Sequence, residues 1–105
     1  MGPWTLWAGE ELVGEVVGAE PDQPWFFGAW QPTEAFEAYR SLFEEELSLL
    51  EAAEERWDEY DRCYGQIREA LQLKTPAGSR VAEWILHVDG GQAWFRFEME
   101  PFTGP

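Results

Sequence analysis

Strand-forming residues dominate the first thirty positions of the chain, in three runs separated by turn residues. Residues 4–7 and 12–17 flank a short segment with one glycine, which is typical of a β-hairpin. Residues 25–30 follow a proline-bounded loop and predict a third, largely buried strand. Because a shift of one residue exchanges the two faces of a hairpin, the pattern leaves open whether Leu6 or Trp7 points inward.

Apolar residues recur every three or four positions through the middle of the chain, which predicts amphipathic helix. Thr33 is a suitable N-cap at its start. The segment 51–54 contains no glycine or proline, so the spacing also fits one continuous helix over 33–71, which would favour dimerisation. Such a helix would have about 38 residues and a length of about 57 Å, which is unusual in a small domain. We therefore predict two helices, over 33–50 and 54–71.

The strongest turn signal is the Asp-Gly-Gly segment at 89–91, which joins two strand-like segments, 82–88 and 92–99. Alternation along them puts six apolar side chains on one face, which we expect to be the core face against the helices: Trp84, Leu86, Val88, Ala93, Phe95 and Phe97. Together with the N-terminal strands, this predicts a single α+β domain over residues 1–105. We expect an antiparallel sheet with two helices packed on one face.

The opposite face of the C-terminal hairpin carries apolar side chains among polar ones. Because Trp and Arg are common interface anchors, we predict a partner-binding surface here, formed by Ile85, His87, Trp94 and Arg96, with Trp7 as a further candidate. Two other interpretations stand. The face is covered from within, by a loop, the tail at 101–102 or a curled sheet, or its aromatic residues are isolated and have no role.

Charge adds a second candidate surface. The chain has 21 acidic and 7 basic residues, a formal net charge of −14, and the helical region holds the largest share of it. Such a field repels nucleic acid and anionic membranes and attracts basic partners. The predicted acidic surface consists of Glu37, Glu44, Glu45, Glu51, Glu55, Asp58 and Glu59. Solubility alone is the alternative explanation for this charge.

Glu46 differs from the other acidic residues, because it falls inside the apolar arc of its helix at 100° per residue. A buried carboxylate is unfavourable unless it is paired. We therefore expect a partner among Arg56, Arg62, His87 and Arg96. A structural ion pair and a proton-transfer group are the two interpretations of an inward Glu46.

The chain lacks the residue patterns that are typical of most enzyme active sites. His87 is the only histidine and Cys63 the only cysteine, and no spacing is typical of a hydrolytic triad, a metal site or a phosphate-binding loop. We therefore expect no catalytic residue, no metal and no cofactor. No apolar run approaches the ~20 residues of a membrane helix. Without a secretory signal pattern, and with a lone thiol, the chain is expected to be cytoplasmic.

Four segments, residues 32–36, 42–46, 86–90 and 93–97, resemble small uncharacterised bacterial proteins. The resemblance would cover most of the chain. Those proteins have no assigned function, so it implies a bacterial origin and a stand-alone domain without identifying a site.

The sequence thus predicts a non-enzymatic module that binds a basic or aromatic-accepting protein partner, such as an immunity protein, an antitoxin or an inhibitor. Its acidic surface would steer the partner and its aromatic residues would supply affinity. The alternative is a small-ligand-binding domain with an aromatic pocket between helices and sheet. The sequence also leaves a homodimer open.

Overall fold

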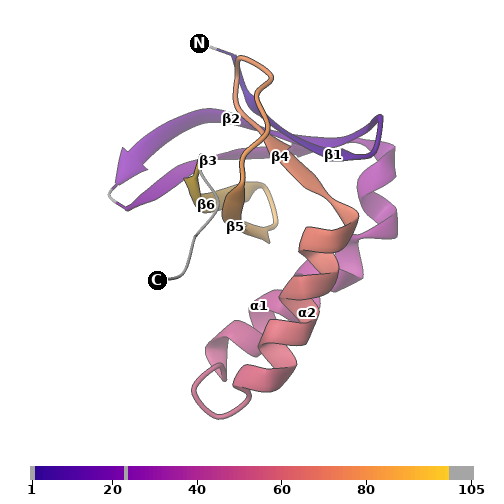
Figure 1. The fold of residues 1–105 in the computed structure, drawn as a ribbon, viewed down its shortest axis with the longest axis vertical. Coiled ribbons are helices and arrows are strands. Elements are labelled where there is room, and N and C mark those ends of the chain that lie inside the picture. Colours follow the sequence, from indigo (N-terminus) through magenta and orange to yellow (C-terminus); the bar gives the residue numbers. More distant parts are fainter. Residues whose placement is uncertain (1, 23, 100–105) are drawn as a thin grey trace.

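The computed structural model describes residues 2–22 and 24–99, which fold into one six-stranded antiparallel sheet and a pair of α-helices (Figure 1). The strands are β1 (Trp4–Ala8), β2 (Glu11–Asp22), β3 (Trp25–Pro32), β4 (Gln72–Lys74), β5 (Glu83–Asp89) and β6 (Gln92–Glu98). Their order across the sheet is β4-β1-β2-β3-β6-β5, so the C-terminal hairpin lies at one edge. The predicted α+β fold is confirmed.

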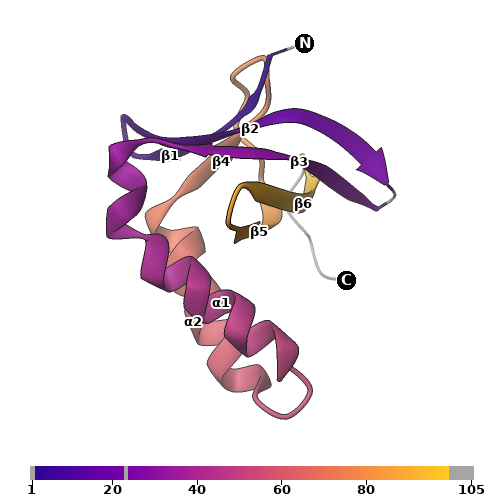
Figure 2. The same cartoon turned by 180° about the vertical axis from the view of Figure 1, so that it is seen from behind.

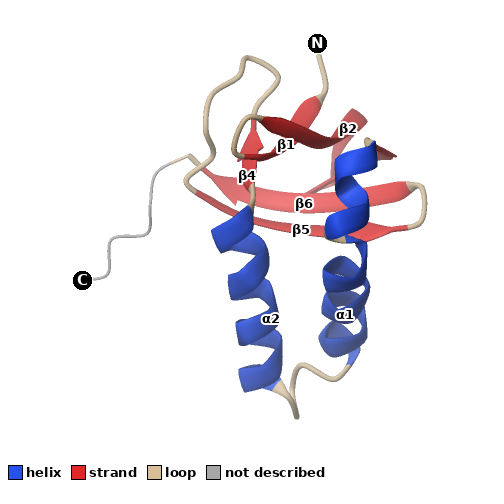
Figure 3. Ribbon diagram, turned by 90° about the vertical axis from the view of Figure 1, so that its right-hand side faces the viewer, coloured by secondary structure: helices blue, strands red, loops and turns tan. Residues whose placement is uncertain are grey.

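The sheet curls until it is nearly a barrel (Figure 3). The segment that leads into β5 runs along β4, where the Val81 N–H donates to the Leu73 carbonyl at 3.0 Å. Lys74 and Arg80 form an isolated antiparallel bridge on the same seam. The Gln72 amide donates to the Val81 carbonyl at 2.8 Å. These bonds join the two edges of the sheet, which its right-handed twist brings towards each other.

Two helices form a hairpin that projects from the sheet (Figure 1 and Figure 2). A 3-10 turn, η1 (Glu34–Ala38), is capped by Thr33, whose Oγ1 accepts from the Ala35 N–H, as the sequence predicts. Helix α1 (Arg40–Glu51) follows, and helix α2 (Trp57–Ala70) returns towards the sheet. The prediction of two helices is confirmed and the continuous helix is wrong. Folding back lets each helix bury its apolar stripe against the other, which a single long helix could not do.

Side chains from different strands fill the interior of the curled sheet. Phe95 and Phe97 of β6 lie against Trp4 of β1, with ring centroids 4.9 and 4.7 Å apart. The same core requires Gly14 on β2, because a Cβ there would lie 2.4 Å from the ring of Trp30. These aromatic contacts therefore reinforce the link between the N-terminal and C-terminal hairpins, which the pairing of β3 with β6 makes through the backbone.

One expectation about the C-terminal hairpin holds only in part, because Trp84 of the predicted core face contacts Tyr64 of α2 but the phenylalanines of that face pack within the sheet. The face that carries Phe95 is core, as predicted, but its phenylalanines pack against other strands of the curled sheet. Helix α1 meets the opposite face, where Glu46 contacts His87 of β5. A flat sheet would offer its apolar face to the helices, whereas a curled sheet fills that face with its own side chains.

Helix α2 covers the outer edge of β5 through one side chain. The Tyr64 hydroxyl accepts from the Leu86 N–H at 2.8 Å and donates to the Trp84 carbonyl at 3.1 Å. Tyr64 is buried, so this hydroxyl pairs two backbone groups that would otherwise face away from β6 without a strand. Burial also raises the pKa of Tyr64 well above that of a free tyrosine.

Candidate functional site

A groove of about 700 Å³ lies between α2 and the C-terminal hairpin. One side of the helix forms its first wall, and the ends of β5 and β6 form the second. We call it the α2 groove, and its lining residues are Trp57, Tyr60, Asp61, Tyr64, Gly65, Arg68, Glu83, Trp84, Ile85, Arg96, Phe97 and Glu98. Its size falls within the ~300–1,000 Å³ of typical ligand sites.

A row of aromatic rings runs along this groove. Trp57 stacks on Tyr60 with centroids 5.7 Å apart, and Tyr60 stacks on Tyr64 at 6.2 Å. Trp84 of β5 meets Tyr64 edge-on at 6.1 Å. The spacing of three and four residues puts these rings on one side of α2. Tyr60, Tyr64 and Trp84 are buried, but Trp57 is 58% exposed, so the row ends in an open aromatic surface.

Gly65 interrupts the helical wall of the groove. A Cβ built at this position would meet nothing within 4 Å. Glycine in a helix interior is less favourable than alanine by about 1 kcal/mol, so the local structure alone gives no reason for it. Its effect is to widen the groove between Tyr64 and Arg68, which both line it.

Charged side chains line both ends of the groove. Arg68 is paired with Glu83 at 2.8 Å, and Glu98, opposite Glu83 on β6, also lines this end. Asp61 lines the other end, next to Trp57. Arg96 also lines the groove, and its guanidinium lies 5.7 Å from the centroid of the Trp25 ring. Both ends of the groove therefore hold a carboxylate outside the Arg68–Glu83 pair.

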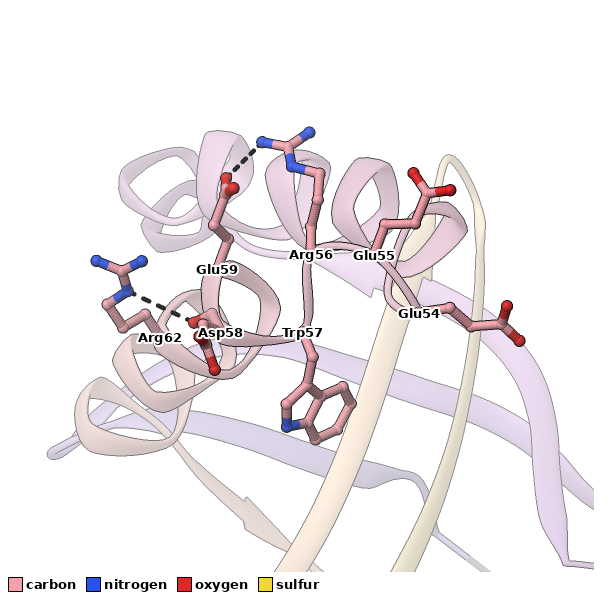
Figure 4. A pocket seen from close by; sticks show the side chains of 7 residues that line it. All are labelled: Glu54, Glu55, Arg56, Trp57, Asp58, Glu59 and Arg62. Carbon is pink, nitrogen blue, oxygen red and sulfur yellow. Dashed lines mark hydrogen bonds and ion pairs between the residues drawn. The ribbon is translucent and has the colours of Figure 1, made fainter.

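The end of the loop between the helices and the start of α2, residues 54–59, surround Trp57 with acidic side chains (Figure 4). We call this region the acidic tip. Five of the eight residues from 54 to 61 are acidic and one is basic. Arg56 forms an ion pair with Glu59, and its hydrogen bond lowers the pKa of that carboxyl. In Figure 4 the Trp57 indole points to the opposite side from Arg56 and Glu55. The acidic tip thus borders the groove without closing it.

The structure shows the exposure of the residues in the predicted acidic surface. All seven of its members are exposed: Glu37, Glu44, Glu45, Glu51, Glu55, Asp58 and Glu59. Glu37 pairs with Arg40 at 2.7 Å, and that hydrogen bond lowers the pKa of the Glu37 carboxyl. Only Glu55, Asp58 and Glu59 belong to the acidic tip. The remainder is spread along η1 and α1.

Glu46 is fully buried, and its partner is one of the four candidates that the sequence offers. Its Oε2 lies 2.8 Å from Nδ1 of His87, and its Oε1 lies 3.0 Å from the same nitrogen. The Tyr60 hydroxyl donates to Oε2 at 2.7 Å. Burial and this carboxylate raise the pKa of Tyr60. One carboxylate thus joins α1, α2 and β5, and Tyr60 links it to the groove.

The residues predicted to bind a partner are not one surface. His87 is buried at 2% exposure between Trp25 and Trp94, with ring centroids 5.4 and 5.3 Å away, so it is not available to a partner. Ile85 and Trp94 are half-buried, and Arg96 is exposed. Of the interpretations that the sequence allows for this face, internal cover accounts for His87. The tail at 101–102 lies outside the described residues.

Trp7 is separated from the C-terminal hairpin by two strands in the sheet order. Leu6 is buried and points inward, which resolves the open register of the N-terminal hairpin. The Trp7 indole donates to the Thr5 hydroxyl, and the Lys74 ammonium lies 4.7 Å from its ring centroid. Trp7 therefore belongs to the β1–β4 region rather than to a shared partner surface.

Sequence reasoning placed Ile85 and Arg96 at a binding surface but did not assign the helical wall of the groove. Trp57, Tyr60 and Tyr64 read as an ordinary apolar helical stripe. The available signal was Gly65 in the middle of that stripe, together with the acidic residues around Trp57.

Among residues 2–22 and 24–99, no group of three or more His, Cys, Asp or Glu side chains is arranged to hold a metal ion. Within the same residues, no helix is long and apolar enough to span a bilayer. No protein-family model, curated protein or solved structure matches this chain.

Proposed function

We propose that this protein is a non-enzymatic interaction module that binds a basic protein partner at the α2 groove. The observation that carries the proposal is the position of Trp57. This side chain is 58% exposed where the acidic tip meets the aromatic wall of the groove. An exposed Trp beside a groove is a suitable interface anchor, and surrounding carboxylates select a partner that carries positive charge.

Electrostatics supports the same assignment. The net charge of −14 attracts basic molecules over long range and repels acidic ones. The acidic tip concentrates this field beside the groove. We infer a role of the kind that immunity proteins, antitoxins and enzyme inhibitors have, in which the module occupies a basic surface of its partner. In an inhibitor of a nucleic-acid-binding enzyme, the carboxylates would take the places of phosphates.

The test is binding to a panel of folded basic and acidic proteins, measured at about 50 mM and about 300 mM NaCl. We expect some basic members and no acidic ones to bind, with weaker binding at the higher salt. Trp57→Ala should reduce binding by about tenfold or more, because it removes a central aromatic anchor. Light scattering on each sample identifies any homodimer that would compete for the same surface.

Phe27→Ala is the matched control, because Phe27 is a large apolar residue on β3 that is 45% exposed and does not line the groove. We expect its binding to equal that of the unmodified protein. Binding that survives Trp57→Ala but is lost in Phe27→Ala would move the interface to the sheet and contradict the proposal. Binding that does not depend on salt would contradict the steering by charge.

A small apolar ligand is the second candidate, and the volume of the α2 groove favours it. Such a ligand would bind between α2 and the C-terminal hairpin, where Tyr64 and Trp84 line the groove, and would raise the melting temperature. A screen of uncharged aromatic compounds by thermal shift separates the two functions. A ligand that stabilises the protein equally at low and high salt supports this candidate, and a screen without any shift counts against it.

A further inference from the structure

The α2 groove has a defined length. Its helical wall runs from Trp57 to Arg68, eleven residues apart, which corresponds to about 16 Å at about 1.5 Å per residue. An extended chain advances by about 3.3 Å per residue, so about five residues of an extended peptide would cover this wall. The groove is therefore long enough for a short linear segment of a partner rather than for one side chain.

The two ends of the wall favour different side chains. Near Trp57 the exposed indole and Asp61 offer an aromatic face and a carboxylate, which together suit an arginine or lysine. Towards the Arg68 end of the wall, Gly65 leaves open space in the groove that Tyr64 and Trp84 also line, which suits an apolar side chain. The distance along the helix from Trp57 to Gly65 is about 12 Å, or about four extended residues.

We propose that the α2 groove binds an extended segment of the partner, with a basic side chain at Trp57 and Asp61 and an apolar side chain four positions away against Gly65. This inference rests on the proposed function and specifies the partner's chemistry. A second copy of this chain is a poor occupant, because two molecules with a net charge of −14 would bring their acidic tips together.

The probes are two blocked pentapeptides, Arg-Ser-Gly-Ser-Leu and its reverse, because the groove does not set the direction of the segment. Their counterparts carry Glu in place of Arg, or Ser in place of Leu. Binding is followed by NMR titration of the indole N–H signals of the tryptophans at low salt. We expect at least one parent peptide to shift the signals of Trp57 and Trp84 in a saturable way, and both counterparts to bind about fivefold more weakly or worse.

Gly65→Leu fills the open space in the wall, and Ala70→Leu adds a leucine to an exposed position of the same helix outside the groove. We expect Gly65→Leu to weaken peptide binding by about fivefold or more, and Ala70→Leu to change it by less than about twofold. Gly65→Ala, which removes less space, replaces Gly65→Leu if circular dichroism shows that the larger residue disturbs the fold; it should still weaken binding more than Ala70→Leu does.

Two charge-matched variants test where the basic side chain of the peptide binds. Asp61→Asn and Glu44→Gln each remove one carboxylate from an exposed helix surface, but only Asp61 lines the groove. We expect Asp61→Asn to weaken binding by about threefold at low salt and Glu44→Gln to have a smaller effect. Equal losses would show that net charge alone attracts the peptide and would overturn the placement of the basic side chain.

The inference is overturned if neither peptide gives saturable shifts, if the shifts appear at Trp25 and Trp94 instead, or if binding is unaffected by filling the space at Gly65. Each of these results leaves the proposed function to its own test with folded proteins. If Trp57→Ala still reduces binding to basic proteins by about tenfold or more there, the module binds a folded surface rather than a linear segment. If it does not, the proposed function itself fails.

Discussion

Glu46 and Glu59 belong to the same helical hairpin, yet their carboxylates have contrasting surroundings. Glu46 is fully buried, where it accepts from Tyr60 and contacts His87. The Glu59 side chain is 48% exposed and pairs with Arg56 at the acidic tip. In water an ion pair is nearly balanced by hydration, whereas a buried carboxylate depends on its partners. The buried end of the hairpin therefore stabilises the fold, whereas the exposed end is accessible to other molecules.

The largest effect should follow from breaking the buried end. Glu46→Ala removes the carboxylate and leaves both His87 and the Tyr60 hydroxyl buried without a partner. We expect a loss of about 3–5 kcal/mol in the free energy of unfolding, measured by urea denaturation. Glu45→Ala, at the exposed neighbouring position, should leave it nearly unchanged. Equal losses in the two variants would mean that burial of Glu46 has no energetic consequence.

A double replacement sharpens this result. Glu46→Leu with His87→Leu removes both members of the pair together, so neither is left buried without the other. The double variant should be more stable than Glu46→Leu alone, and the thermodynamic cycle should show coupling between the sites. Additive effects would argue that Glu46 and His87 do not interact.

Alkaline pH should have the next largest effect, again through the buried end. Burial, with help from nearby carboxylates, raises the pKa of Cys63 from 9.0 to about 11, and the pKa values of Tyr60 and Tyr64 are also raised. The folded chain therefore holds these protons more tightly than the unfolded chain does. Their contribution to stability is complete below about pH 9 and falls as the pH rises through the folded-state values.

Urea denaturation at several pH values between about 8 and about 11 measures this loss. In Cys63→Ala the free energy of unfolding should fall less steeply over the same range, because one of the titrating groups is gone. A slope identical to that of the unmodified protein would exclude Cys63 as a contributor.

The smallest effect is expected at the exposed end. Glu59→Gln removes the ion pair with Arg56 in water, so the melting temperature should change by no more than about 2 °C. Adding salt should reduce even this difference. A change as large as that of Glu46→Ala would contradict the contrast between the two ends.

The elements and the buried carboxylate could be predicted from the sequence because both depend on local periodicity. The three-four spacing located the helices, the Asp-Gly-Gly turn located the C-terminal hairpin, and 100° per residue turned Glu46 inward. The sequence left four candidate partners for Glu46, and only the fold shows that the partner is His87. The break between the helices at residues 52–56 also had no glycine or proline to mark it.

The α2 groove and the burial of His87 could not be predicted in the same way, because they depend on how the whole sheet curls. Curling accumulates from the twist of six strands and from pairing between residues as distant as Leu73 and Leu6. It decides which face of β5 and β6 meets a helix, and where α2 leaves a gap beside them. Alternation along one hairpin separates the two faces but does not say what covers each.

The hydrogen bonds of Tyr64 have a consequence for how molecules of this protein behave towards one another. An unprotected outer strand can add a strand from a neighbouring molecule and start aggregation. On β5, the Tyr64 hydroxyl already occupies the Leu86 N–H and the Trp84 carbonyl, two of the groups that such a strand would need. Tyr64 of α2 thus protects this strand edge from aggregation, next to the groove where we propose that the partner binds.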